Sequence, residues 1–306
     1  MQVHRGIEKL PGFRNAVITI GTFDGVHEGH QKIIAALKEE AIRVGGETVL
    51  ITFHPHPRMV VQNTRPMQLI NTQEEKIELL RKAGLDHLVI VPFTTLFSEQ
   101  SAEEYIRDFL IRNFQPATII IGFDHRFGKG RSGDYKLMEE MAPVYGYHLL
   151  EIPKHVLDEI GVSSTKIRNA IMESDIETAN KLLGYNFFFE GIVIEGDQLG
   201  RALGYPTANL QYNDPDKIRL GHGVYAVYAE VEGSCKGGML SIGTRPTLTR
   251  SDERIEVNIF DFDQDIYGKT IRIFVKKYLR GQQKYASLDE LIQQLHEDKK
   301  NSLAVL

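Results

Sequence analysis

The sequence predicts an α/β protein in which a doubly wound parallel sheet is followed by a six-stranded antiparallel β-barrel and a C-terminal helix. Short apolar runs alternate with helix-patterned segments up to about residue 184, and short runs punctuated by glycine dominate from about residue 186. A helical period returns near the end. With 306 residues, 42% hydrophobic and 25% charged, the chain has the length and composition of about two soluble globular domains.

Five apolar runs in the first half predict buried strands. Their near-continuous Ile, Val and Leu content is typical of parallel strands that are covered on both faces, and the segments between them are long enough for crossover helices. In the first such segment, four residues share one helical face: Ile33, Ile34, Leu37 and Ala41. The runs are 16–20, 48–53, 87–93, 118–123 and 148–153. We therefore expect a Rossmann-like open sheet, where ligands bind at the carboxyl ends of the strands.

Six short runs in the second half predict a closed antiparallel barrel. Closure suits a segment with little helix between its strands, because it removes unpaired sheet edges. The runs are 187–196, 206–212, 223–233, 237–243, 254–262 and 270–279. The tail then changes its period: Ser287 is a suitable N-cap, and apolar residues follow it at helical spacing, namely Leu288, Leu291, Ile292 and Leu295. One helix should close the chain.

The stretch 163–186 separates the two patterns. It has the amphipathic pattern of a helix and not the glycine and serine content of a flexible linker, so we expect a stiff junction. The predicted domains are therefore 1–184 and 185–306.

Charge and cysteine content exclude several classes. The net charge is −5 and neither half has an excess of Lys and Arg, which disfavours binding of nucleic acid through its phosphates. A single cysteine, Cys235, excludes an intramolecular disulfide and a cysteine-based zinc site. The N-terminal residues lack an apolar signal region, and no stretch approaches about 18 apolar residues. We expect a cytoplasmic protein that does not enter a membrane; an oligomer is left open.

The segment GTFDGVHEGH, residues 21–30, has the features of a phosphate site. A strand leads into three glycines and then a helix, so that backbone N–H groups and the positive end of the helix dipole point to one place. His27 and His30, three apart, share one face of the first turn. Two other roles are open: the histidines could cap the helix, or bind zinc, although helical zinc pairs are usually four apart. The three glycines around the pair favour phosphate binding over these two alternatives.

Three further segments follow predicted strands. FHPHP, 53–57, is either a proline-rigid loop or the border of a ligand site. GFDHRFGKGRSGD, 122–134, is either a solvated basic loop or a phosphate-binding loop. VSSTKIR, 162–168, contains hydroxyls that either cap a helix or, together with Arg168, hold a polyphosphate, because arginine binds phosphate in a bidentate way.

The second half contains its own polar constellation. In the extended segment PTAN, Thr207 and Asn209 point to the same side and could share one cation, although a turn followed by an ordinary edge strand would look the same. In RIEVNIF, alternation puts Glu256 on the face opposite Val257. Inside a barrel, a lone carboxylate that faces a polar site is a suitable general base; the alternative is a surface acidic residue.

The first half resembles the H-x-G-H nucleotidyltransferase superfamily, and GTFDGVHEGH is similar to the form found in bacterial FMN adenylyltransferases. The resemblance implies that His27 and His30 are catalytic and stabilise charge on the α-phosphoryl group of ATP while the phosphate of FMN attacks in line. It further implies ATP contacts at Gly21, Phe23, Gly25, His27, His30, Ser164, Thr165 and Arg168. The implied FMN contacts are His56, Pro57, Asp124 and Arg126.

The second half resembles the riboflavin kinase family in its G-R-x-L-G-x-P-T-A-N loop, its glutamate strand before DFDQDIYG, and its closing YLRGQQKYASLDELIQQLHED. The resemblance implies that Glu256 activates the ribityl hydroxyl, and that Thr207 and Asn209 bind magnesium with ATP. The implied ATP contacts are Gly200, Arg201, Gly204, Thr207 and Asn209, and the implied flavin contacts are Arg280 and Tyr285.

Together the two resemblances imply ATP-dependent phosphorylation of riboflavin to FMN, then adenylylation of FMN to FAD with release of pyrophosphate. The expected substrates are small molecules, namely riboflavin, FMN and ATP, with Mg²⁺ at both sites. Two alternatives differ from this. The first is an adenylyl- or cytidylyltransferase for another phosphate ester, with an accessory barrel; the second is a flavin- or nucleotide-sensing binding module.

Overall fold

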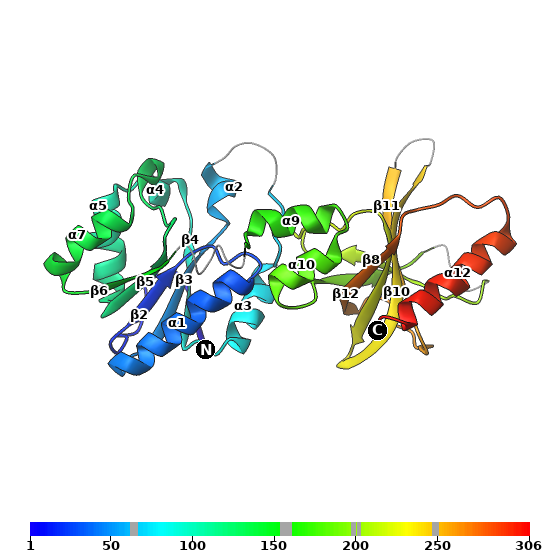
Figure 1. The fold of residues 1–306 in the computed structure, drawn as a ribbon, viewed down its shortest axis with the longest axis horizontal. Helices are drawn as coiled ribbons and strands as arrows, with labels where there is room; N and C mark the ends of the chain where they lie inside the picture. The colour runs from blue at the N-terminus through cyan, green and yellow to red at the C-terminus, as the bar shows by residue number, and fades with distance from the viewer. Residues whose placement is uncertain (62–66, 154–160, 197–199, 201–202, 247–250) are drawn as a thin grey trace. The chain divides into compact units, whose positions relative to one another are not determined.

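The computed structural model describes residues 1–61, 67–153, 161–196, 200, 203–246 and 251–306. The chain divides by its contacts into two compact units, Met1–Ser163 and Ser164–Leu306, which are described separately below (Figure 1). The helices that precede the barrel therefore group with the barrel. The domain limits 1–184 and 185–306 stay predictions of the sequence.

The first unit is built on a sheet of six parallel strands in the order β1-β4-β3-β2-β5-β6. The five predicted strands are confirmed, and the sheet has one more, β1, at its edge beside β4. The strands are β1 (Gln2–Arg5), β2 (Val17–Ile20), β3 (Thr48–His54), β4 (His87–Pro92), β5 (Thr118–Gly122) and β6 (His148–Ile152).

Helices cover both faces of this sheet (Figure 1). Alternate strand residues face two separate cores: Ile18 and Ile51 pack with the η1–α7 side, whereas Val17 and Leu50 pack with α1 and α3. The helices are α1 (Glu28–Val44), α2 (Pro57–Val61), α3 (Gln73–Lys82), α4 (Thr95–Ser98), α5 (Ala102–Glu104), the π-helix η1 (Tyr105–Ile111), α6 (Arg112–Phe114), the 3₁₀-helix η2 (Lys129–Arg131) and α7 (Tyr135–Tyr145).

The strand order places a switch point beside β2. From β2 the chain proceeds to β3 and then β4 on one side, while β5 and β6 lie on the other side. In open parallel sheets, ligands bind outside the carboxyl ends of the strands where the order reverses. That position is occupied here by the segments that follow β2, β3 and β5.

The second unit is a closed barrel of six antiparallel strands in the order β10-β11-β8-β7-β12-β9, as the sequence predicts. Paired residues such as Leu240 and Val257, both 0% exposed, face its interior. The strands are β7 (Phe188–Ile194), β8 (Ala208–Tyr212), β9 (Gly223–Val231), β10 (Ser234–Pro246), β11 (Ser251–Ile259) and β12 (Thr270–Arg280).

The described residues of the second unit also include the helices α9, α10 and α12. The predicted helical stretch 163–186 contains two of them, α9 (Ser164–Met172) and α10 (Ile176–Leu183), because the chain turns at Ser174, whose φ is 66°. The closing helix α12 (Leu288–Leu303) is confirmed with its N-cap, since the Ser287 side chain accepts a hydrogen bond from the backbone N–H of Glu290 at 3.2 Å.

Candidate functional site

The turn Gly21–His27 joins β2 to α1 through unusual backbone conformations. Phe23, Gly25 and Val26 have positive φ angles of 46°, 91° and 37°. Glycine adopts this region freely, but for a β-branched residue such as Val26 it costs about 1–3 kcal/mol. Turns with left-handed positions direct successive backbone N–H groups toward one point, where an anion can bind. The strained backbone of this turn therefore coincides with the phosphate site that the sequence predicts.

His27 is the N-cap of α1, and its ring lies against His30. Its Nδ1 accepts a hydrogen bond from the backbone N–H of His30 at 3.3 Å, and the two ring centroids are 3.7 Å apart with the planes nearly parallel. Gly29 permits this contact, because a Cβ there would lie 3.3 Å from the His27 ring and 2.9 Å from Val162 Cγ1. The sequence favours phosphate binding over capping, and the structure corrects this choice: His27 does cap the helix, and Nδ1 is the atom that accepts the hydrogen bond.

Burial and two neighbours set the charge of His30. Burial comes first, and the His27 ring and the Lys76 ammonium add to it, in holding the pKa of His30 well below its ordinary value. The imidazole is therefore neutral near pH 7. Its Nδ1 is buried and has no hydrogen-bond partner among the residues that the structure describes. An anion that arrives beside this ring would favour its protonation.

Two buried charged residues connect the turn to α3 and to the residues just before it. Asp24 is 1% exposed, and its Oδ1 accepts hydrogen bonds from the backbone N–H groups of Ile70 and Asn71 at 2.9 and 3.3 Å. Lys76 is 5% exposed, and its Nζ donates to the carbonyl oxygen of Thr22 at 2.8 Å. The sequence prediction missed both residues as parts of the site.

The segment that follows β3 lies at the same edge of the sheet. His56 is buried, and its Nδ1 accepts a hydrogen bond from the backbone N–H of Arg58 at 3.1 Å. Pro57 begins α2. The topology thus brings both residues to the carboxyl edge next to β2, while their contact with FMN stays a prediction.

The segment that follows β5 supplies the other side of the switch point. Asp124 is exposed, and Arg126 Nη1 donates to Asp134 Oδ2 at 2.7 Å. Asp134 is also the N-cap of α7, so this ion pair fixes the loop against a helix. The guanidinium of Arg126 is exposed, and its predicted role with FMN is untested by this arrangement.

The segment VSSTKIR, which the sequence predicts to hold a polyphosphate, continues into the second unit from Ser164. Ser164 begins α9, and Thr165 and Arg168 follow within its first turns. Thr165 is exposed, whereas Ser164 and Arg168 are partly buried. Their role with the triphosphate stays a prediction.

The barrel brings together two residues that the sequence predicts from separate motifs. Glu256 of β11 is the cross-strand partner of Asn209 of β8, and opposite residues of an antiparallel pair have their side chains on the same face about 5 Å apart. This is the outer face, because the neighbouring Val257 faces the barrel interior. The expectation of a carboxylate inside the barrel is therefore wrong in its location, although both polar side chains do share one surface.

Two glycines pack closely against this surface. A Cβ on Gly196 would lie 1.9 Å from Asn209 Nδ2, and a Cβ on Gly200 would lie 2.3 Å from the carbonyl oxygen of Tyr205 and 3.2 Å from Thr207 Oγ1. Gly196 and Gly200 can thus lie against Asn209 and Thr207 only because they carry no side chain.

Gly204 and Pro206 follow Gly200 in the motif. Gly204 has a φ of 78°, which glycine adopts freely. Pro206 is held by Asn258 of β11, whose Nδ2 donates to the Pro206 carbonyl oxygen at 2.7 Å. Arg201, a predicted ATP contact, lies outside the described residues.

The predicted flavin contacts are held by the closing helix. Arg280 donates from Nε and Nη2 to the two carboxylate oxygens of Asp298 at 2.8 and 2.6 Å, and Asp298 is 1% exposed. The Arg280 guanidinium lies 6.0 Å from the centre of the Tyr285 ring. The Tyr285 hydroxyl is buried and makes no hydrogen bond within the described part of the chain. Flavin binding by this pair stays a prediction.

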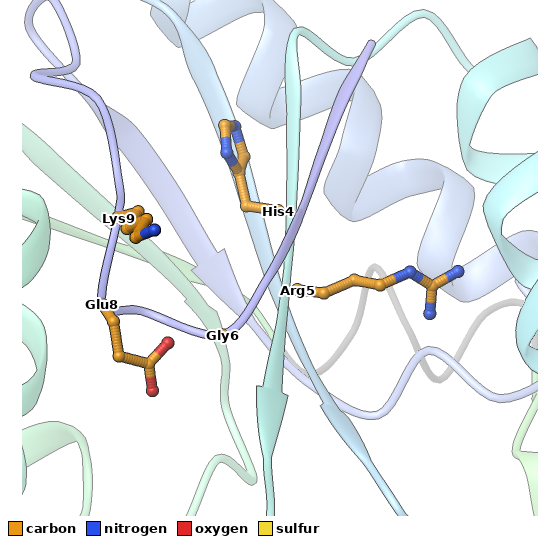
Figure 2. Close-up of a pocket in the computed structure, with 5 residues that line it drawn as sticks. All are labelled: His4, Arg5, Gly6, Glu8 and Lys9. Carbon is orange, nitrogen blue, oxygen red and sulfur yellow. The ribbon is translucent and has the colours of Figure 1, made fainter.

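A cavity of about 250 Å³ opens elsewhere, beside β1. Figure 2 shows that His4 and Arg5 project to opposite sides of the strand, so their polar groups do not converge. None of its residues was predicted from the sequence. The cavity lies at the carboxyl end of the edge strand β1, which β4 and β3 separate from β2. Its lining is His4, Arg5, Gly6, Glu8 and Lys9.

Two features are absent from the residues that the structure describes. Those residues contain no group of three or more His, Cys, Asp or Glu side chains that could hold a metal ion. None of the helices in the described part of the chain is long and apolar enough to span a membrane.

Comparisons with known proteins cover nearly the whole chain. The family model described as FAD synthetase matches residues 11–166, and that described as riboflavin kinase matches residues 183–306. The bifunctional riboflavin kinase/FMN adenylyltransferase of Bacillus subtilis is 38% identical over 94% of this chain and 92% of its own length. The protein of the same name from Escherichia coli K12 is 33% identical over 97% of this chain and 96% of its own length. A crystal structure titled macrolide-efflux protein, from Streptococcus pneumoniae, has a TM-score of 0.89 at 30% identity and covers 98% of both chains.

Proposed function

Since this chain belongs to the bifunctional riboflavin kinase/FMN adenylyltransferase family, we propose how its residues divide the two activities. The chain phosphorylates riboflavin to FMN and adenylylates FMN to FAD. We assign the second reaction to the edge of the sheet around His27 and His30, and the first to the outer surface of the barrel around Glu256 and Asn209. The observation that carries the assignment is that each set is assembled from residues that the sequence predicts for one reaction only.

Adenylyl transfer requires the phosphate of FMN to approach the α-phosphorus of ATP while pyrophosphate leaves. The turn Gly21–His27 offers backbone N–H groups at the start of α1, where the helix dipole favours negative charge. His27 and His30 lie beside that point, and the low pKa of His30 keeps its ring neutral near pH 7. As charge grows on the phosphoryl oxygens, hydrogen bonds from the two imidazoles strengthen, which stabilises the transition state without a covalent intermediate.

The segments after β3 and β5 are proposed to hold FMN. Both border the switch point, so a flavin phosphate bound between them would face the turn. His56 and Pro57 would border the flavin on one side, and Asp124 and Arg126 on the other. Ser164, Thr165 and Arg168 are proposed to hold the triphosphate, on the basis of their motif.

Phosphorylation of riboflavin requires removal of a proton from the primary hydroxyl of the ribityl chain. Glu256 is proposed to be the general base, because it lies on the same barrel face as Asn209, the proposed ATP ligand. Arg280 and Tyr285 would hold the flavin, and the buried Tyr285 hydroxyl has its bonding capacity left for such a ligand.

Magnesium is proposed to bind with ATP at Thr207 and Asn209. Hydroxyl and amide oxygens suit this hard cation, which usually takes few protein ligands besides phosphate oxygens. Gly196 and Gly200 bring backbone close to these two side chains, because a Cβ at either position would meet Asn209, Thr207 or the Tyr205 carbonyl oxygen. When bound, the ion neutralises phosphate charge, which lowers the barrier to attack by the hydroxyl that Glu256 deprotonates.

The simplest test is to incubate the full chain with riboflavin, ATP and magnesium and to follow FMN and FAD by chromatography. We expect FMN to appear first and FAD to accumulate after it. FAD formation from added FMN without riboflavin phosphorylation would instead support a transferase with an accessory barrel. Binding of flavin without either product would support a sensing module.

The setting of the protein is also a proposal. A chain with one cysteine, and with ATP as a substrate of both reactions, suits the reducing, ATP-rich cytoplasm. Small-molecule substrates are proposed as its partners, without nucleic acid, because neither half of the sequence carries a basic excess. Self-association stays open.

A further inference from the structure

Lys76 is a buried charge that the catalytic scheme above does not use. Its side chain is 5% exposed, although lysine is almost never fully buried unless its charge is compensated. It projects from the first turns of α3, whose start is fixed by a capping box between Thr72 and Glu75. Burying an ammonium group is costly, so its position calls for a reason in the structure around it.

The ammonium group meets the strained turn directly. Nζ donates to the carbonyl oxygen of Thr22, and the same oxygen accepts from Thr52 Oγ1 at 3.1 Å. Two residues later Asp24 accepts from the backbone of Ile70 and Asn71, just before α3. Each of the segments 22–24 and 70–76 thus supplies a side chain that binds the backbone of the other. We name this set of contacts the clasp.

The clasp explains how the turn keeps its conformation. Positive φ angles at Phe23 and Val26 persist only where the surrounding structure over-determines them. The clasp holds Thr22 and Asp24, on either side of Phe23, and the His27 cap holds the chain directly after Val26. Without the clasp, the segment could relax to ordinary angles, and the N–H groups and His27 would move away from the phosphate.

The two charges of the clasp depend on each other. The Asp24 carboxylate is close enough to oppose the lowering of the Lys76 pKa that burial causes, so the lysine keeps a negative neighbour inside the protein. Lys76 in turn contributes to the low pKa of His30. The titratable groups that lower the pKa of His30 are therefore the His27 ring and the Lys76 ammonium, and the titratable group that acts on Lys76 is Asp24.

We infer that Lys76 is a positioning residue for adenylyl transfer, which acts through the turn Gly21–His27 by holding the Thr22 carbonyl within the clasp. This inference rests on the proposed assignment of adenylyl transfer to that turn. It assigns Lys76 no contact with FMN or with the reacting atoms. Its loss should therefore affect the handling of phosphate and leave FMN recognition unchanged.

The test compares Lys76→Met, which keeps the length of the side chain, with Lys82→Met on the same helix. Lys82 is exposed and pairs with Glu78 at 2.7 Å, so it is a matched control. In the full chain, K76M should lower kcat/KM for ATP in FAD formation by about 100-fold, the size of loss that small misplacements of a site cause. The KM for FMN should stay within about twofold, and the inhibition constant of pyrophosphate should rise, because it probes the phosphate site directly. K82M should match the wild type.

Riboflavin phosphorylation by the same samples shows whether the chain is folded and active elsewhere. Should K76M prove too unstable to assay, the double variant Asp24→Asn/Lys76→Met removes both buried charges, which is less harmful than leaving one alone. It should fold and show the same selective loss. FAD formation within about twofold of wild type in K76M or in the double variant would overturn the inference, as would a loss that falls on the KM for FMN. If the wild type converts riboflavin to FMN but not FMN to FAD, the proposed function itself fails.

Discussion

The two sites are built in different ways. The site at the sheet edge uses backbone: one strained turn, a helix N-terminus and two stacked histidines within ten residues of sequence. The barrel site uses side chains from two strands, Asn209 and Glu256, which are far apart in sequence and are joined by strand register. The first should therefore be sensitive to changes that alter backbone geometry, and the second to changes that alter single functional groups.

Glycine serves both sites by leaving space. Gly29 allows the His27 ring to approach, and Gly196 allows the loop to approach Asn209. In both cases a Cβ would occupy the place of a functional side chain, so the glycines are part of the site geometry and do not merely make the chain flexible.

The largest effect should come from Glu256→Gln. The amide cannot accept the hydroxyl proton, so riboflavin phosphorylation should fall by about 10²–10⁴-fold. FAD formation from added FMN should stay near the wild-type rate. Both rates are measured by chromatography on one preparation, and a parallel fall in both would mean that the sites are not separate.

His30→Ala should produce the reverse pattern. FAD formation from FMN should fall by about 10²–10³-fold, because one charge-stabilising group is lost from the phosphate site. Riboflavin phosphorylation serves as the control and should not change. An unaltered FAD rate would remove His30 from the mechanism.

Gly196→Ala tests the space above Asn209. The added Cβ would overlap the Asn209 amide, and overpacking of this kind costs about 1–3 kcal/mol. We expect the KM for ATP in riboflavin phosphorylation to rise by about tenfold. Gly12→Ala is the control, since a Cβ there has nothing within 4 Å. Equal kinetics of the two variants would show that the close approach of Gly196 to Asn209 does not affect ATP binding.

Acid should weaken the first unit through its buried histidines. Burial lowers the pKa of His125 to about 4, below its ordinary value of 6.5, and His30 is shifted in the same direction. As the pH falls below 6.5, the unfolded chain therefore binds more protons than the folded chain. Each of these histidines then lowers the free energy of unfolding by up to about 1.4 kcal/mol per pH unit.

This effect can be read from urea unfolding at pH 7 and pH 5, with FAD-forming activity as the probe of the first unit. His125→Phe keeps an aromatic ring but cannot titrate, so its midpoint should depend less on pH than that of the wild type. An identical pH dependence in both proteins would show that His125 does not carry the effect.

The sequence predicts the arrangement of elements well, because buried parallel strands and barrel strands have distinct apolar patterns. β1 escapes prediction because QVHR is short, partly exposed and lies at the sheet edge beside β4. The break in the helical stretch 163–186 is missed because the left-handed residue there is Ser174, whereas a glycine would have indicated such a turn.

The site is predicted less completely, for a physical reason. Motifs identify residues that are close in sequence, such as His27 and His30, but cannot give the register that pairs Glu256 with Asn209 or the barrel face on which they lie. Lys76 is missed although a signal exists: it precedes Ile77 on the buried side of α3, where a lysine is unexpected. Asp24 lies inside a recognised motif, yet only the structure shows that it binds the backbone before α3.

The central claim is that one chain holds two separate sites joined by free FMN. A mixing experiment tests it most directly: E256Q and H30A are each supplied with riboflavin, ATP and magnesium, alone and together, and FAD is measured. Each variant alone should form almost no FAD, whereas the mixture should form it, because FMN made by H30A is used by E256Q. Failure of the mixture to form FAD, although E256Q converts added FMN and H30A makes FMN, would contradict the claim.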